Sequence, residues 1–314
     1  MENIKPKKKS SIGGQAVIEG VMMRGPDSIS MCIRKADGEV AIEKRPYKSF
    51  IQKVPILKLP ILRGIVAFFE SMIIGMKTLM NSADYFDLEV DEADYKPSKF
   101  EEFITKLCGD KLKDVIVFFS LILSIFLGVG LFIIVPNVIA KFTFSNDRFM
   151  YNVVEGIARL VIFFLYIILI AYMEDIRRVF QYHGAEHKTI HCYEHEEGLT
   201  VENVKKYPVL HPRCGTSFLL IVMVVSIAVF SFFWDKNFWI TLAERLALLP
   251  LVAGISYEII KYAGKSDSKF AECISIPGMW MQKFTTREPD DSQIEVAIKA
   301  LEHVLVDDPE ADKW

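Results

Sequence analysis

Four of the six histidines in this 314-residue sequence stand four positions apart, at His183, His187, His191 and His195. On a helix, steps of four place the first three on one face, while the fourth drifts off it toward solvent. Residues 183–187 also have an H-x-x-E-H pattern. Two imidazoles one turn apart can hold a divalent metal, and Glu186 beside them could act as a general base.

A histidine and a cysteine follow in the short motif HPRCG, residues 211–215, which predicts a tight turn. Zinc prefers nitrogen and sulfur ligands, so four side chains could close a tetrahedral site. These four are His183, His187, His211 and Cys214. If either His211 or Cys214 does not bind the metal, a water would complete the coordination sphere, and Glu186 could activate that water. His191 and Glu258 are additional candidate ligands.

The elements that must position these residues include four apolar segments. They are expected to span a membrane at about 114–140, 154–173, 216–234 and 243–260. Residues 115–135 contain no charge, and their length suits a bilayer span of about 20 residues. The second span continues into the histidine segment without a glycine or proline, which favours one unbroken helix.

The distribution of basic residues predicts the orientation. Residues 1–113, 174–215 and 261–314 hold 19, 6 and 7 of the 37 lysines and arginines, and the two opposite loops hold three. Cytoplasmic loops are enriched in lysine and arginine. Both termini and the histidine segment are therefore expected in the cytoplasm of a multi-pass protein of the cell membrane.

Residues 56–80 are apolar but carry Arg63, Glu70 and Lys77 at seven-residue spacing, which places the three charges on one stripe of a helix. This pattern favours an interfacial amphipathic helix on the cytoplasmic leaflet. A re-entrant or bundle-buried helix is the second interpretation. A fifth crossing ranks last, because it would export the lysine-rich N-terminus.

The remaining segments read as small soluble elements. Residues 28–35 and 40–47 alternate around Asp37-Gly38 and predict a β-hairpin. Residues 12–26 contain four glycines, which indicate turns and close backbone approach, and residues 84–102 are expected to form an acidic loop. Pro277-Gly278 marks a turn, and Ser292 with Glu295 predicts a capping box before a short C-terminal helix.

The expected fold is mainly α: a polytopic membrane protein with about four transmembrane helices, an interfacial amphipathic helix and a small cytoplasmic β-hairpin region. Four parts follow along the chain: a β-containing region at 1–55, the amphipathic helix and acidic loop at 56–113, the membrane domain at 114–262 with its cytoplasmic segment 174–215, and a tail at 263–314. Apolar spans exclude a purely soluble protein, and the net charge of −3 excludes a strongly basic nucleic-acid binder.

Four motifs in order, GGQAVIEGVMMRGP, YHGAEHKTI, HPRCGTSFLL and TTREPDDSQIEVAI, resemble the YqhQ family of bacterial membrane proteins. The resemblance covers about residues 11–306 and implies an integral membrane protein described as a predicted metal-dependent enzyme, with no established reaction. The family motifs fall on His183, Glu186, His187, His211 and Cys214.

Two functions remain open. The favoured one is an accessory or regulatory subunit of a membrane assembly, such as transport or translocation machinery, with a structural zinc site on the inner face. The alternative is a metal-dependent hydrolase of a membrane-proximal peptide, lipid headgroup or phosphoester, with Glu186 as general base. Expected partners are the lipid bilayer and a membrane-protein complex or a second copy of the chain, and no nucleic acid.

Overall fold

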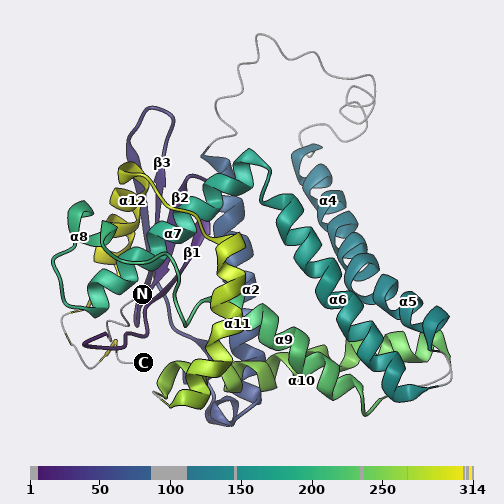
Figure 1. Ribbon diagram of the computed structural model, residues 1–314. Helices are drawn as coiled ribbons and strands as arrows, with labels where there is room; N and C mark the ends of the chain where they lie inside the picture. Colours follow the sequence, from purple (N-terminus) through teal and green to yellow (C-terminus); the bar gives the residue numbers. More distant parts are fainter. Residues whose placement is uncertain are drawn as a thin grey trace. The chain divides into compact units, whose positions relative to one another are not determined.

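The computed structural model describes residues 6–85, 112–144, 147–233, 237–266, 268–306, 308 and 311–312. It is mainly helical with one small antiparallel sheet (Figure 1). The expected acidic loop at 84–102 lies almost wholly outside the described residues.

The sheet is a four-stranded meander in the order β1-β2-β3-β4. Its strands are β1 (Gly13–Val17), β2 (Gly20–Arg24), β3 (Ser28–Arg34) and β4 (Val40–Pro46). The predicted hairpin is confirmed as β3 and β4, with Cys32 paired to Ile42. The structure adds β1 and β2, because the glycine-rich segment expected to form turns is a second hairpin.

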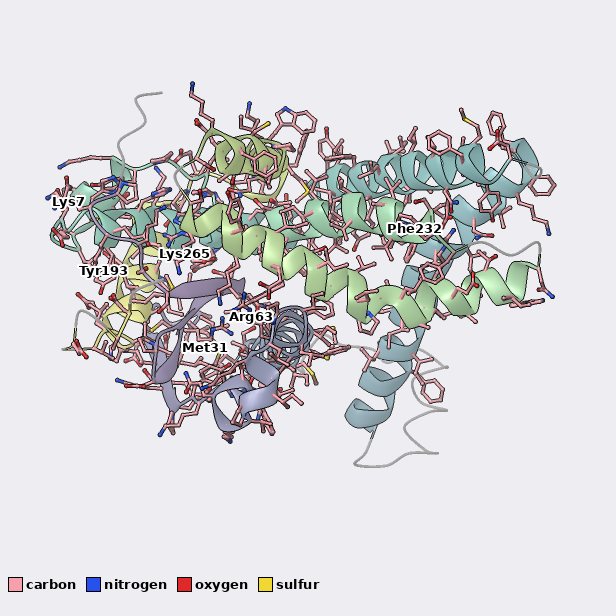
Figure 2. All side chains as sticks on the ribbon, turned by 90° about the horizontal axis from the view of Figure 1, so that it is seen from below. Lys7, Met31, Arg63, Tyr193, Phe232 and Lys265 are labelled. Carbon is pink, nitrogen blue, oxygen red and sulfur yellow. The ribbon has the colours of Figure 1, made fainter. Side chains whose placement is uncertain are left out.

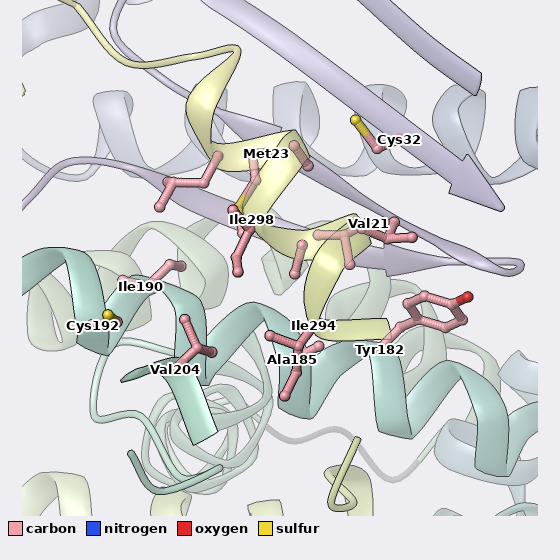
Figure 3. Close-up of a cluster of buried hydrophobic side chains, with 14 of the residues drawn as sticks. Val21, Met23, Cys32, Tyr182, Ala185, Ile190, Cys192, Val204, Ile294 and Ile298 are labelled. Atoms are coloured by element: carbon pink, nitrogen blue, oxygen red, sulfur yellow. The ribbon is translucent and has the colours of Figure 1, made fainter. Parts of the chain in front are cut away.

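Both faces of the sheet are covered. On one face, α7 (Glu174–Glu194) and α12 (Asp291–Glu302) pack on the strands, with Val21, Met23 and Cys32 in the shared core (Figure 3). On the other face, the alternate residues Met22 and Met31 pack with Ile74 of α2 (Leu62–Asp84). Successive side chains of a strand point to opposite faces, so β2 and β3 carry apolar side chains on both faces of the sheet.

The core on the α7 side fixes the helix that carries the histidine stripe. Tyr182, Ala185 and Ile190 of α7 are buried against Ile294 and Ile298 of α12 (Figure 3). The short helix α8 (Val201–Lys205) adds Val204 to the same core. Apolar contacts of this kind hold one face of α7 rigidly, so its other side chains are presented in fixed directions.

The chain divides into two compact units. One contains Met1–Phe86, Leu165–Ser226 and Leu248–Trp314, and therefore the sheet, α7 and the C-terminal helices. The other contains Asp87–Phe164 and Ile227–Ala247. Its helices include α4 (Leu112–Val129) and α5 (Val135–Thr143), joined by the π-helical turn η4 (Gly130–Ile134), and most of α6 (Arg148–Ile170).

Three helical stretches within the described residues are long and apolar enough to cross a membrane, at Phe119–Thr143, Phe149–Ile170 and Trp239–Lys265. The last belongs to α10 (Phe238–Lys265). The expected span at 216–234 corresponds to α9 (Gly215–Phe230), an apolar helix of 16 residues. At 1.5 Å per residue α9 reaches about 24 Å, shorter than a hydrocarbon core of about 30 Å.

Three local expectations are corrected. The histidine helix does not continue unbroken from the second span, because residues 171–173 separate α6 from α7. Pro277 and Gly278 lie inside α11 (Lys269–Thr285) and form no turn. The capping box of α12 uses Asp290 and Gln293, two residues earlier than expected.

The segment before α2 forms two short helices, α1 (Phe50–Lys53) and η1 (Pro55–Lys58). The expected helix at 56–80 therefore begins later, at Leu62, and continues to Asp84.

Candidate metal centre

The first two histidines of the stripe share a face of α7, as their spacing predicts. The ring centroids of His183 and His187 are 4.4 Å apart. Helix α7 begins with Glu174 and Asp175, whose carboxylates suit the positive end of the helix dipole. The helix is therefore well formed at its start, and its core-facing residues set its rotation.

Cys214 comes to the same place from the turn that precedes α9. Its Sγ lies 3.2 Å from Nε2 of His183 and 3.4 Å from the backbone nitrogen of Thr216. One donor atom from each of His183, His187 and Cys214 lies within 4.8 Å of the others. Two imidazole nitrogens and a thiolate are ligands that zinc accepts, so these three residues could hold a metal ion.

Each imidazole is oriented by a backbone carbonyl. Nδ1 of His183 lies 2.8 Å from the carbonyl oxygen of Thr285, and Nδ1 of His187 lies 2.6 Å from that of Val209. A proton on Nδ1 satisfies each carbonyl and leaves the lone pair of Nε2 free. Metal-ligating histidines are commonly held in this way by a second hydrogen bond.

Glu186 lies beside the three donors and is 5% exposed. It meets β1 at Gly14, where a Cβ atom would come within 2.9 Å of the Glu186 side chain. Burial raises the pKa of the Glu186 carboxyl, while the nearby rings of His187 and His183 and the Gly14 backbone N–H act in the opposite direction. The absence of a side chain at Gly14 is what allows the carboxylate to sit there.

The charges of the donors are coupled. Burial disfavours a thiolate at Cys214, but the neighbouring His183 and His187 outweigh it and hold the pKa of Cys214 well below its ordinary value. Burial likewise opposes a charged His183, yet the Cys214 sulfur raises the pKa of His183 to about 9. Without a metal, the site therefore favours a thiolate–imidazolium pair.

Comparison with known proteins assigns the chain to a family. Residues 59–307 match the family described as "Protein of unknown function (DUF1385)". The chain belongs to the DUF1385 family. It is also 35% identical over 306 residues to "Uncharacterized protein YqhQ" of Bacillus subtilis (strain 168). This alignment covers 96% of this chain and 94% of the Bacillus protein. No solved structure matches significantly.

The DUF1385 match includes Glu186 and the three clustered donors, whereas Gly14 precedes it. The alignment with the Bacillus protein agrees with the resemblance that the four motifs indicate. Neither comparison assigns a reaction, so the chemistry must be argued from the site.

In this DUF1385 protein, His211 lies outside the three-donor cluster. Its backbone N–H donates to Oε1 of Gln282 and its carbonyl accepts from Nε2 of Gln282, both at 2.8 Å. Its own Nε2 lies 3.8 Å from Glu194. The His211 ring remains near the site, with its centroid 5.6 Å from that of His187.

The other candidates also have different partners. His191 lies 2.9 Å from the carbonyl oxygen of Leu210. His195 is not solvated as expected: it is 7% exposed and packs on Tyr207. Glu258 pairs with Arg63 at 2.7 Å and is not among the clustered donors.

Two supporting residues of the DUF1385 site have no motif signal in the sequence. Glu194 is 1% exposed and accepts from the backbone and hydroxyl of Ser10 at 2.7 and 3.0 Å, and it pairs with Arg213. Gln282 is fully buried. An indirect signal exists for Glu194 alone: Arg213 lies inside the HPRC motif, and a charged residue in a tight turn needs a partner.

Proposed function

We propose that this protein is a multi-pass membrane protein with a metal-dependent hydrolytic site on its cytoplasmic side. The observation that carries the proposal is the arrangement of three donors, His183, His187 and Cys214, with the buried carboxylate of Glu186 beside them. Catalytic zinc sites keep three protein ligands and an open position, whereas structural sites are closed by four.

The donor chemistry fits zinc, since the two rings present Nε2 and the environment favours a thiolate at Cys214. A bound zinc ion would supply Lewis-acid polarisation and lower the pKa of a bound water. The chain itself contributes the proton transfer. Burial raises the pKa of Glu186, so this carboxylate can take a proton and return it to a leaving group.

The proposed substrates are those that a site at the inner membrane surface can reach: a membrane-proximal peptide, a lipid headgroup or a phosphoester. Four spans, with both termini and α7 in the cytoplasm, follow from the basic residues of the sequence. The three long apolar helices and the shorter apolar helix α9 support the spans in this proposal, whereas the orientation rests on the basic residues alone.

A second candidate is an accessory subunit of a membrane assembly in which the metal is structural. The proximity of His211 favours it, because the ring lies 5.6 Å from His187 and a modest rotation could supply a fourth nitrogen ligand. The two candidates therefore differ in the role of Glu186, which is dispensable in a structural site.

The first experiment measures metal per chain by elemental mass spectrometry on detergent-purified protein. We expect about one ion per chain in the parent and in Glu186→Gln, and none in a His183→Ala, His187→Ala variant. Glu202→Gln, an exposed carboxylate on α8, is the matched control. Absence of metal from the parent purified without chelators would overturn both candidates.

The second experiment asks whether the Glu186→Gln variant complements a deletion strain, that is, whether it returns the strain to the parental phenotype. The hydrolase predicts that it fails while retaining metal and normal membrane levels, and that Glu202→Gln succeeds. Full restoration by Glu186→Gln would reject the hydrolase and leave the subunit.

A further inference from the structure

Helix α2 has its polar and small residues inside and its large apolar residues outside. Its buried residues are Gly64, Gly75, Thr78 and Ser82. Its exposed large apolar residues are Leu62, Phe69, Met72, Ile73, Met76, Leu79 and Met80, and Ile73 is the most open at 64% exposure. A surface helix of a soluble protein shows the reverse pattern, so this helix has an unusual environment.

The polar side of α2 is used by contacts with the β-sheet. The carbonyl oxygen of Gly75 accepts from the Gln15 amide at 3.4 Å, and Oγ1 of Thr78 accepts from Arg45 at 3.2 Å. The hydroxyl of Ser82 accepts from the Ile18 backbone at 3.3 Å. The sheet therefore faces the polar side of α2, and among the described residues none covers the exposed apolar side of this helix.

Two of the three charges on the α2 stripe are also satisfied within the protein. Arg63, labelled in Figure 2, pairs with Glu258 of α10. Glu70 accepts from the Tyr47 hydroxyl, the Ser49 hydroxyl and the Phe50 backbone at 3.2, 2.7 and 2.6 Å. Charged groups at membrane depth require such partners, whereas charges in water do not.

The first turns of α2 lie directly against apolar helices. At Gly64, a Cβ atom would come within 2.8 Å of the Gly254 carbonyl oxygen of α10, so the two backbones are in close contact. Phe68 packs on Phe218 of α9 with ring centroids 5.9 Å apart. Close approach at small residues is typical of helix pairs in membranes, and α10 is one of the long apolar helices.

We propose that the exposed apolar face of α2 contacts the acyl chains of the bilayer. The contact with α10 places the start of α2 beside a helix that would itself be surrounded by lipid, so its outward face continues the lipid-facing surface. A groove of about 310 Å³ lies on this face, lined by Met72, Ile73, Met76, Lys77, Met80 and Asn81. Lys77, one of the lining residues, is exposed and can extend its amine to the headgroups. The inference is independent of the metal site.

The test uses a fluorophore attached to a cysteine. Ile73→Cys is made in the full chain with Cys108 and Cys273 changed to Ser, labelled with NBD and reconstituted into vesicles of phosphatidylethanolamine and phosphatidylglycerol containing doxyl-labelled lipid. Leu165→Cys, on the exposed face of α6, is the lipid-facing reference, and Glu302→Cys, exposed on α12, is the aqueous reference. Met76→Cys is a second position on the same face, should Ile73→Cys fail to reconstitute.

We expect emission at position 73 to shift to shorter wavelength and to lose as much intensity to doxyl lipids as at position 165. Emission and quenching equal to those at position 302 would overturn the proposal. Efficient cross-linking between two copies through position 73, without lipid quenching, would overturn it in favour of a dimer interface.

Discussion

Nε2 of His183 and Sγ of Cys214 lie 3.2 Å apart, although 31 positions separate them in the chain. The contact joins the third turn of α7 to the residue before α9. It depends on two backbone carbonyls that orient the histidine rings and on the buried pair of Glu194 and Arg213 beside the turn.

Gly14 and Gly13 are adjacent glycines that differ in what a side chain would meet. At Gly14, a Cβ atom would lie 2.8 Å from the Met22 carbonyl oxygen and 2.9 Å from the Glu186 side chain, whereas at Gly13 nothing lies within 4 Å. We expect Gly14→Ala to lower the free energy of unfolding by about 1–3 kcal/mol, as overpacking does, and to impair complementation. Gly13→Ala is the control, and equal melting temperatures of the two variants would contradict the placement of Glu186.

Cys214 and Cys32 are both buried, but their surroundings differ. The neighbouring histidines hold the pKa of Cys214 well below its ordinary value, while burial raises the pKa of Cys32 to about 11. In metal-free protein at neutral pH, we expect the ultraviolet thiolate absorption to disappear in Cys214→Ser and to remain in Cys32→Ser. His183→Ala should shift the appearance of the thiolate to higher pH. A thiolate signal unaffected by Cys214→Ser would refute the coupled pair.

Glu194 makes stability depend on acid pH. Although burial favours the neutral acid, His211 and the Arg213 guanidinium lower the pKa of Glu194 to about 2. A depressed folded-state pKa stabilises the protein above the unfolded value of about 4.5, and this stabilisation, about 3 kcal/mol, is lost as pH falls from about 4.5 to about 2. Thermal unfolding in detergent should show this loss in the parent and in Glu202→Gln, and it should be absent from Glu194→Gln. An identical pH profile in Glu194→Gln would contradict the prediction.

Glu155 holds two arginines within the second compact unit. Oε2 of Glu155 accepts from Arg245 at 2.8 Å and Oε1 accepts from Arg159 at 2.5 Å, and the Glu155 side chain is 2% exposed. Arg245 also donates to the Asn152 side chain and to the Phe230 carbonyl. Because Glu155→Ala leaves buried charge uncompensated, we expect a loss of about 3–5 kcal/mol, measured by thermal unfolding in detergent. The control is Leu246→Ala, at an exposed position of α10, which should change the free energy of unfolding very little. An equally small change in Glu155→Ala would show that the ion pairs of Glu155 with Arg159 and Arg245 add no stability.

The sequence anticipates those parts of the fold whose signals are local. Strands β3 and β4 are confirmed because alternation and an Asp-Gly turn suffice for a hairpin. Strands β1 and β2 are not predicted, because glycine is rare in strands. Pairing of β2 with β3 and packing of Val21 and Met23 on α12 stabilise the extended segment. Pro277 lies within α11 because the surrounding packing outweighs its local preference for a helix end.

The four-residue spacing is enough to predict that His183 and His187 share one face of a helix, since four residues make about one helical turn. Tertiary structure decided which of the two later candidates joins them: Cys214 does, whereas His211 is held by Gln282. It also decided that Gly14 leaves room for Glu186, and that Arg63 and Glu70 of α2 turn toward partners within the protein. These outcomes depend on contacts between residues far apart in the chain, and periodicity describes only how neighbours along one helix or strand share a face.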